Sequence, residues 1–485
     1  MNSVKDMGDI NLNKTATLKS GIRWNSFSSV ISIGIRLLRG FVVPKVLAPA
    51  SYGLYTSISL FLRYFNFFDL GATYYFSKEF PHIHFNRKSV ERDRFVNEVF
   101  SFFLFSFLFV AGLLIVLSCF YDGQSADFYQ LAFLLLIPIV LFSKIREFYN
   151  AYAYGVQNYK LPAISGILYD LISLVFVVLG IYFFGAIGGV CSMVVVELTI
   201  FFYYKSIIDV KVKIVASKEI FSHIKQYLKQ FFVVISEIFA VTLDQLFIFN
   251  VFFATRLGFY SLGITFGTLF IATGEILKNT ILSKIMILGK SSEKEAMLLF
   301  NKTIFYYLLI CALAVPMGII AIEIIVTYYF DNYILGLEVY FVLLVSGVVK
   351  GVVSLMRIGF IASNKEKRYI LCTFVSITYY CIGFAFAYYF GLLFNQVVVL
   401  IIAMDVVSFF ILYSTLNKEK TVLYWKNLIL FGSIILVAIP YQFFLRSKVF
   451  DFKPNFGLLY IAIFFLVCGI IALKSRFNFK NYLNK

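Results

Sequence analysis

Long apolar segments recur along the whole chain and constrain its fold more than any other feature. A membrane-spanning helix needs about 20 predominantly apolar residues, and fourteen segments of roughly that length are bounded by polar or charged residues. The chain is also 61% hydrophobic and only 14% charged, against about 45–50% and about 25% in soluble domains. We therefore predict an all-α integral membrane protein with about 14 transmembrane helices. The predicted spans are residues 25–47, 53–76, 97–120, 130–154, 162–184, 186–204, 229–254, 258–282, 301–325, 333–361, 369–390, 393–414, 427–445 and 455–474.

The cations of the connecting segments predict the orientation of these spans. Lysine and arginine concentrate in cytoplasmic loops, and here they fill the N-terminal tail, every second connection and the C-terminal tail. The opposite connections contain only Arg256, Arg446, Lys448 and Lys453. Both termini are therefore expected to be cytoplasmic, in a multi-pass protein of the cytoplasmic (inner) membrane.

Several classes of site find no support in the sequence. The net charge of +17 lies mostly in loops that face anionic lipid headgroups, so it does not indicate a nucleic-acid partner. The cysteines fall in predicted spans without a C-x-x-C pair, and His82 and His84 lack a third ligand nearby, so we expect no metal site. The tail of a P-loop at 288–292 lacks its first glycine, because Lys284 stands there. We expect no cofactor and no catalytic residues.

An internal repeat divides the chain. Residues 46–57 resemble residues 251–262 when Gly53 is aligned with Gly258 and Tyr55 with Tyr260, a shift of 205 residues. Each copy lies at a predicted outer turn, so the first twelve spans form two lobes of six with the same orientation. The predicted organisation is an N-terminal lobe, an amphipathic cytoplasmic linker, a C-terminal lobe, and two further spans with a cytoplasmic tail. Their boundaries are 1–204, 205–228, 229–414 and 415–485.

The sequence around these repeated turns resembles the polysaccharide transporters of the multidrug/oligosaccharidyl-lipid/polysaccharide (MOP) superfamily, which include flippases of O-antigen and capsule repeat units. The resemblance lies in YGLY at 52–55 with FFDLG at 67–71, and in Asp244 with LGFYSLG at 257–263. It implies two six-helix lobes around a central cavity, alternating access, and transfer of a polyprenyl-pyrophosphate-linked oligosaccharide from the cytoplasmic to the outer leaflet. It also implies membrane lipids, H⁺ or Na⁺, and other polysaccharide-assembly proteins as partners.

Cations within the predicted spans are the candidate substrate-binding residues. A charged group near the centre of a span costs at least about 2.5–3.5 kcal/mol on insertion scales, and guanidinium groups bind phosphate oxygens bidentately. A cavity lined by such groups would suit a pyrophosphate. The alternative is that each cation pairs with a buried acid or extends to the membrane surface. The candidates are Arg36, Arg39, Arg63, Lys144, Arg146, Lys278 and Lys350.

Acidic residues in or near the spans are the candidates for ion coupling, because a buried carboxyl group can bind a proton or sodium. They are Asp69, Glu237, Asp244 and Glu275. The alternative is a structural salt bridge, for example between Asp244 and Arg39 or between Glu275 and Lys278. The shift of 205 residues aligns Asp244 with Arg39.

Three other functions compete with this reading. A multidrug or cation antiporter of the same superfamily would share the two-lobe plan, but its cavity should be acidic. A peptidoglycan-precursor flippase also has fourteen spans, and the sequence separates it least well. A membrane polysaccharide polymerase would be expected to have a long outer loop, whereas the predicted outer connections are short.

Overall fold

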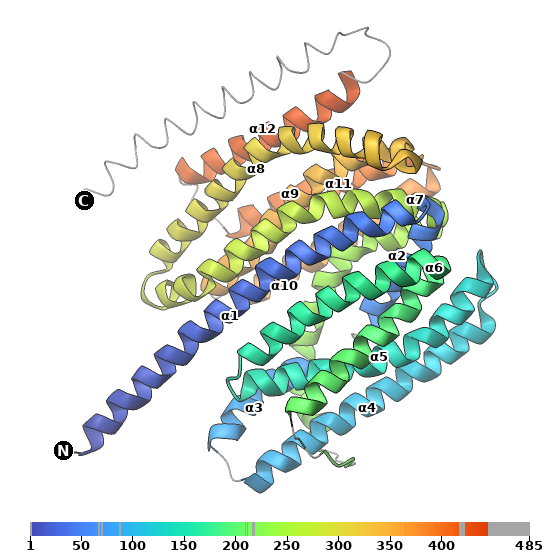
Figure 1. Cartoon of the computed structure of the whole chain (residues 1–485). Coiled ribbons are helices and arrows are strands. Elements are labelled where there is room, and N and C mark those ends of the chain that lie inside the picture. The colour runs from blue at the N-terminus through green and yellow to red at the C-terminus, as the bar shows by residue number, and fades with distance from the viewer. Residues whose placement is uncertain are drawn as a thin grey trace. The chain divides into compact units, whose positions relative to one another are not determined.

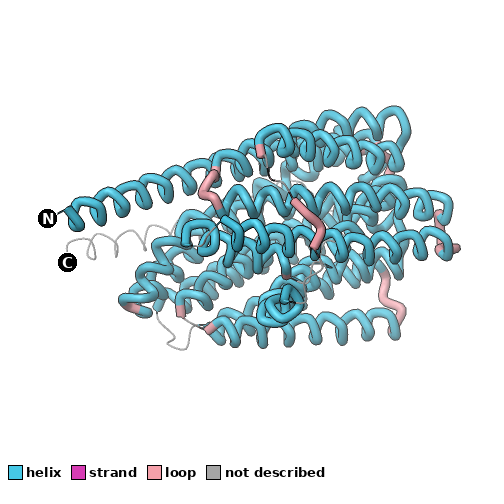
Figure 2. The backbone as a smooth tube through the Cα atoms, turned by 90° about the horizontal axis from the view of Figure 1, so that it is seen from below, coloured by secondary structure: helices cyan, strands magenta, loops and turns pink. Residues whose placement is uncertain are grey.

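The computed structural model describes residues 2–65, 68, 71–86, 89–208, 210, 212–215, 219–363, 365–416 and 422–444. Every regular element in these ranges is a helix (Figure 2). Nine of the described helical segments are long and apolar enough to cross a membrane. The predicted all-α membrane fold is therefore confirmed, and the chain divides into two compact units, Met1–Ile238 and Phe239–Lys485.

The first unit contains α1 to α6 and the start of α7 (Figure 1). Their bounds are α1 Asn2–Val46, α2 Pro49–Phe65, α3 Ala72–Asn86, α4 Ser89–Phe120, α5 Ala126–Gly155, α6 Lys160–Ile207 and α7 Glu219–Ser291, which continues into the second unit. Helix α6 packs against both α1 and α5, and α5 packs against α4. The unit is therefore a helix bundle in which α6 is central.

Helix α6 contains two of the predicted spans. Gly185 lies between them with φ 64° and ψ −151°, and this non-helical backbone divides α6 into two helical parts. The two parts touch near this turn, because a Cβ atom on Gly180 would lie 2.5 Å from the carbonyl oxygen of Gly188. Glycine tolerates the positive φ at position 185, and its lack of a Cβ atom permits the close backbone approach at position 180. The predicted boundary between residues 184 and 186 coincides with this turn.

The predicted span 53–76 is not one continuous helix. Helix α2 ends at Phe65 and α3 begins at Ala72, and Gly71 before it has a positive φ of 85°. A residue with this φ cannot continue a right-handed helix. The apolar composition of the segment gave no sign of this interruption. Asp69, a predicted ion-coupling residue, lies outside the described residues.

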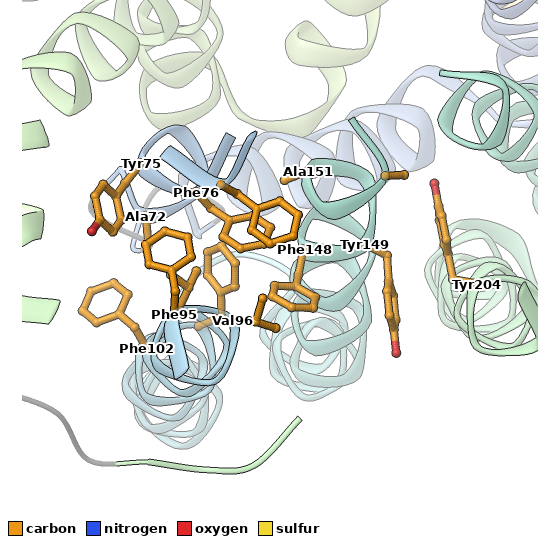
Figure 3. Packing of buried hydrophobic residues seen from close by; sticks show 14 of the residues in the cluster. Ala72, Tyr75, Phe76, Phe95, Val96, Phe102, Phe148, Tyr149, Ala151 and Tyr204 are labelled. Carbon is orange, nitrogen blue, oxygen red and sulfur yellow. The ribbon is translucent and has the colours of Figure 1, made fainter. Parts of the chain in front are cut away.

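An aromatic cluster holds α3, α4 and α5 together (Figure 3). Phe76 lies at its centre and stacks on Phe80, Phe95 and Phe148, with ring centroids 4.7, 5.7 and 5.2 Å apart. Phe76, Phe80 and Phe148 are fully buried. Such rings bury large apolar areas and gain about 0.5–1.5 kcal/mol per pair beyond that burial. The cluster therefore fixes the end of the unit where the predicted cytoplasmic loop between 76 and 97 lies.

The extended segment before α7 lies along α4. The backbone N–H of Lys213 donates to Asn97 Oδ1 at 2.7 Å, and that of Val215 donates to Ser101 Oγ at 2.8 Å. Val210 and Val212 pack against the aromatic cluster. The predicted amphipathic helix of the linker begins at Glu219 as the start of α7 and runs on into the next span without a break.

The second unit continues with five further helices and one short 3₁₀ helix. They are α8 Glu293–Tyr329, η2 Asp331–Gly336, α9 Leu337–Ala362, α10 Glu366–Tyr389, α11 Phe394–Leu416 and α12 Val422–Phe444. Helix α7 is interrupted at Phe253, which has φ 62° and ψ −174°. A shift of 205 residues brings Phe253 onto Ala48, which lies between α1 and α2. The interruption of α7 therefore aligns with the turn between α1 and α2.

Two helices of the second unit meet through glycine. A Cβ atom on Gly347 of α9 would lie 2.5 Å from the Cα atom of Gly267 of α7. One turn further along α9 and two turns further along α7, a Cβ atom on Gly274 would lie 2.7 Å from the carbonyl oxygen of Gly351. Small residues at such positions let two helix backbones approach closely.

Helix α12, the thirteenth predicted span, packs into the core of the second unit. Asn427 is fully buried, and its Nδ2 donates to the backbone oxygen of Asn301 at 3.2 Å and to Tyr413 Oη at 2.9 Å. Phe431 stacks on Phe409 with a centroid distance of 3.9 Å. The fourteenth predicted span, 455–474, lies outside the described residues.

Candidate functional site

A buried ion pair forms the centre of a polar cluster in the first unit. Arg146 of α5 binds Glu197 of α6 bidentately, with Nε and a terminal nitrogen 2.9 and 3.0 Å from the two carboxylate oxygens. The Glu197 side chain is 1% exposed and that of Arg146 is 24% exposed. The guanidinium also lies over the ring of Tyr169, 4.6 Å from its centroid. Such a pair is well satisfied, which is the condition for keeping two charges in an apolar bundle.

Arg39 of α1 enters the same cluster but has a different kind of partner. Its guanidinium donates a hydrogen bond to the hydroxyl of Ser173 on α6, and it lies within electrostatic reach of the buried Tyr55 on α2. Among the described residues of the first unit, no carboxylate forms an ion pair with Arg39. Within this unit its positive charge is therefore not neutralised by a neighbouring acid.

Other cations of the first unit do have acidic partners. Arg36 lies 3.6 Å from Asp170, although its side chain is 55% exposed. Lys144 is buried and donates to Glu147 at 2.9 Å. With these pairs included, the cations around the cluster still outnumber the acids by one, and Arg39 carries the excess.

A second polar cluster lies within the second unit. Lys350 Nζ of α9 donates to Asp244 Oδ2 of α7 at 2.7 Å. Tyr260 of α7 donates its hydroxyl proton to the same oxygen at 2.6 Å. Asp244 is 1% and Lys350 14% exposed at the side chain.

Asp405 of α11 completes this second cluster. It accepts hydrogen bonds from the hydroxyls of Ser346 on α9 and Tyr380 on α10. Asp405 is 4% exposed, and both Lys350 and Asp244 lie within electrostatic reach of it. Two carboxylates face one ammonium group, so this cluster has one negative charge in excess when all three groups are ionised.

The two clusters occupy corresponding helices of the repeat. The shift of 205 residues aligns Arg39 with Asp244 and Tyr55 with Tyr260. Likewise, Arg146 and Lys350 lie on the fourth predicted span of their halves, and Glu197 and Asp405 lie on the sixth. The first cluster consists of Arg39, Tyr55, Arg146, Tyr169, Ser173 and Glu197, and the second of Asp244, Tyr260, Ser346, Lys350, Tyr380 and Asp405. The same framework therefore holds opposite excess charges.

The remaining predicted site residues lie away from these clusters or are not described. Arg63 is exposed in the last turn of α2, whereas in α7 Lys278 is half-buried and Glu275 is exposed. Glu237 lies in α7, but its side chain is not among those described. The described ranges contain no group of three His, Cys, Asp or Glu side chains that could hold a metal ion.

Sequence reasoning missed several partners in these clusters. Asp170 and Glu197 were not singled out, although a carboxylate inside an apolar span is by itself a signal of a buried partner or of function. Ser173, Ser346 and Tyr380 had no comparable signal, because hydroxyl residues are common in spanning helices and their role depends on which helix faces meet.

Solved membrane transporters share the fold of this chain, whereas no family model and no curated protein sequence matches it. A structure described as the lipid II flippase MurJ in an inward closed conformation is 16% identical, with a TM-score of 0.67 over 94% of this chain and 99% of that one. An inward-facing MATE family multidrug resistance transporter of the MOP superfamily is 13% identical, with a TM-score of 0.62 over 85% and 96%. An outward-facing MATE structure is also 13% identical, with a TM-score of 0.55 over 86% and 97%. The chain therefore has the fold of MOP superfamily transporters.

Proposed function

We propose that this protein is a flippase that carries a polyprenyl-pyrophosphate-linked oligosaccharide, an O-antigen or capsule repeat unit, across the cytoplasmic membrane. It moves this lipid from the cytoplasmic to the outer leaflet by alternating access. The shared fold supports transport rather than catalysis, and the chain's cations support an anionic cargo. Both termini are cytoplasmic in this proposal, as the charges of the loops indicate.

The observation that carries the proposal is the environment of Arg39. A guanidinium in an apolar span needs a compensating anion or water, and the described partner of Arg39 is the neutral hydroxyl of Ser173. Its remaining N–H groups can donate to phosphate oxygens, and a bidentate arginine–phosphate contact is among the stronger charge-assisted hydrogen bonds. An uncompensated arginine would repel a cationic drug, so it disfavours a multidrug antiporter.

The test restores a deletion strain with wild-type, Arg39→Ala, Arg39→Lys or Arg36→Ala genes. Arg36→Ala is the matched control, because Arg36 lies on the same helix but already pairs with Asp170. We expect Arg39→Ala to abolish surface polysaccharide and to leave repeat units on the lipid carrier, and Arg36→Ala to restore export. Arg39→Lys should restore less than wild type because an ammonium cannot bind phosphate bidentately. Unchanged polysaccharide together with raised drug sensitivity in the deletion strain would refute the proposal.

A peptidoglycan-precursor flippase is the second candidate. It is favoured by the likeness to the structure described as a lipid II flippase, which extends over nearly the whole chain. Both cargoes would present a lipid-linked phosphate group to Arg39, so this residue does not separate them. Depletion of the gene does: lysis and loss of cell-wall synthesis would indicate the peptidoglycan precursor, whereas viable cells that lack surface polysaccharide would indicate the repeat unit.

A further inference from the structure

Two side-chain contacts fix how α10 and α11 face each other in the second unit. The hydroxyl of Tyr380 donates to Asp405, and the thiol of Cys372 donates to Thr415 Oγ1 with a sulfur–oxygen distance of 3.6 Å. The helices run in opposite directions, so both contacts belong to one register. Asp405 lies ten residues, about 15 Å along the helix, from Thr415 near the end of α11.

Two serines lie between these contacts. Ser376 is one turn from both Cys372 and Tyr380 on α10, and Ser408 is one turn from Asp405 on α11, so their positions lie on the facing surfaces of the two helices. Ser376 is 4% and Ser408 7% exposed. Within the described ranges, neither hydroxyl has a hydrogen-bond partner in the protein. Each departs even from the usual serine contact with a carbonyl one turn earlier in its own helix.

Unpaired buried hydroxyls indicate water. Leaving such a group without a partner costs about 1–3 kcal/mol, and buried water commonly satisfies groups of this kind by bonding to two to four of them. Two hydroxyls on the facing surfaces, offset by about two residues or about 3 Å along the helices, supply such partners. The α10–α11 interface therefore has a hydrated character from Asp405 toward the helix end that is expected to be cytoplasmic.

The excess negative charge of the second cluster indicates that this water delivers a proton to Asp405. Asp405 faces Lys350 and Ser346 from α9, Tyr380 from α10, and Asp244 with Tyr260 from α7. The ammonium group of Lys350 is already hydrogen-bonded to Asp244. A second carboxylate would leave an excess negative charge in the bundle, which a bound proton removes at the lowest cost.

We propose that Asp405 is a proton-binding site of this protein and that Ser376 and Ser408 line the water path connecting it with the cytoplasmic end of the second unit. Asp405 can be held in either protonation state. As a carboxylate it accepts from Ser346 and Tyr380, and as a carboxylic acid it donates to one of these hydroxyls, since a hydroxyl is both donor and acceptor. Proton binding at Asp405 does not depend on the proposed transport function. Only its role does, since in that function the proton would couple substrate movement to the proton gradient.

The experiment measures protonation directly, by infrared spectroscopy of the full chain in lipid nanodiscs without a lipid-linked substrate. We expect a carbonyl band of a protonated carboxyl group near neutral pH that disappears as the pH rises. The band should be lost in Asp405→Asn and kept in Asp331→Asn, which removes an exposed acid of η2. A band that persists in Asp405→Asn would overturn the assignment. A failure of the flippase test leaves this measurement unaffected.

Two further variants keep the proposal testable if Asp405→Asn does not fold. Asp244→Asn leaves one carboxylate with one ammonium, so the band should disappear at lower pH than in the wild type. Lys350→Met leaves two carboxylates without a cation, so the band should persist to higher pH. Shifts in the same direction, or no shift, would refute the charge argument. Loss of the band on adding Na⁺ at constant pH would show that sodium competes for the site, and would overturn the proposal that the bound cation is a proton.

The path has its own variant. Ser376→Ala combined with Ser408→Ala removes the two hydroxyls that would hold the water but leaves the charges of the cluster in place. We expect the response of the band to a pH jump to slow by about a hundredfold or more, the lower end of what a positioned proton-transfer group contributes, while the pH at which half of the band is lost stays the same. An unchanged rate would overturn the path.

Discussion

Removing Glu197 should strongly destabilise the first unit. Glu197→Ala leaves the guanidinium of Arg146 inside the bundle without the two charge-assisted hydrogen bonds of 2.9 and 3.0 Å. Breaking a buried ion pair by removing one partner costs about 3–5 kcal/mol. The matched control is Glu293→Ala, which removes a carboxylate at 2.8 Å from Lys365 that is 54% exposed. An exposed pair of that kind contributes about 0–1 kcal/mol.

The assay is the free energy of unfolding in bicelles by steric trapping, for both single variants and for Arg146→Met combined with Glu197→Met. Because the double variant leaves no unpaired buried charge, it should be more stable than Glu197→Ala. Equal losses for Glu197→Ala and Glu293→Ala would refute the reasoning, since burial would then make no difference. A double variant that is no more stable than Glu197→Ala would also contradict it.

Three further predictions concern packing and pH. Gly347→Ala should cost about 1–3 kcal/mol by overpacking against Gly267, whereas Gly432→Ala, whose Cβ meets nothing within 4 Å, should be neutral or stabilising in the same unfolding assay. Asn427→Ala should cost about 1–3 kcal/mol, because the buried backbone oxygen of Asn301 and the hydroxyl of Tyr413 lose the amide group that donates to them. An unchanged free energy of unfolding would contradict this. Burial and a nearby arginine lower the pKa of His84, outside the spans, from 6.5. The unfolded chain therefore binds a proton more readily, so stability should fall as pH drops below about 6.5, and His84→Asn should reduce that slope.

The sequence predicted the helical fold because apolar length is a local property. Any segment of about 20 apolar residues must satisfy its backbone hydrogen bonds internally, and a helix does this. The same reasoning failed at 53–76, where one helix ends at Phe65 and the next begins at Ala72. A single residue with positive φ, Gly71, changes the path of the chain, and a hydropathy pattern contains no information on φ.

The sequence identified the cations of the charged site, but it identified few of the residues that pair with them. An arginine or lysine within a span is visible from composition, and Arg39, Arg146 and Lys350 each proved to have polar partners from other helices. Which acid or hydroxyl meets each cation depends on the rotation of each helix about its own axis. The predicted alternative of a salt bridge holds for Arg146 with Glu197 and for Lys350 with Asp244.

The shift of 205 residues aligns two residues of opposite charge, Arg39 and Asp244. A charge buried in a helix bundle is tolerated only if the facing helices change with it. In the first half, Arg39 faces the hydroxyl of Ser173 and keeps its positive charge. In the second half the corresponding residue is Asp244, and α9 supplies Lys350 as its counter-ion. Among the described residues of the first half Arg39 has no such counter-ion, so the two aligned positions differ both in charge and in whether that charge is neutralised. In the two proposals made above, the excess positive charge around Arg39 binds the anionic lipid, and the excess negative charge around Asp244 and Asp405 binds the proton.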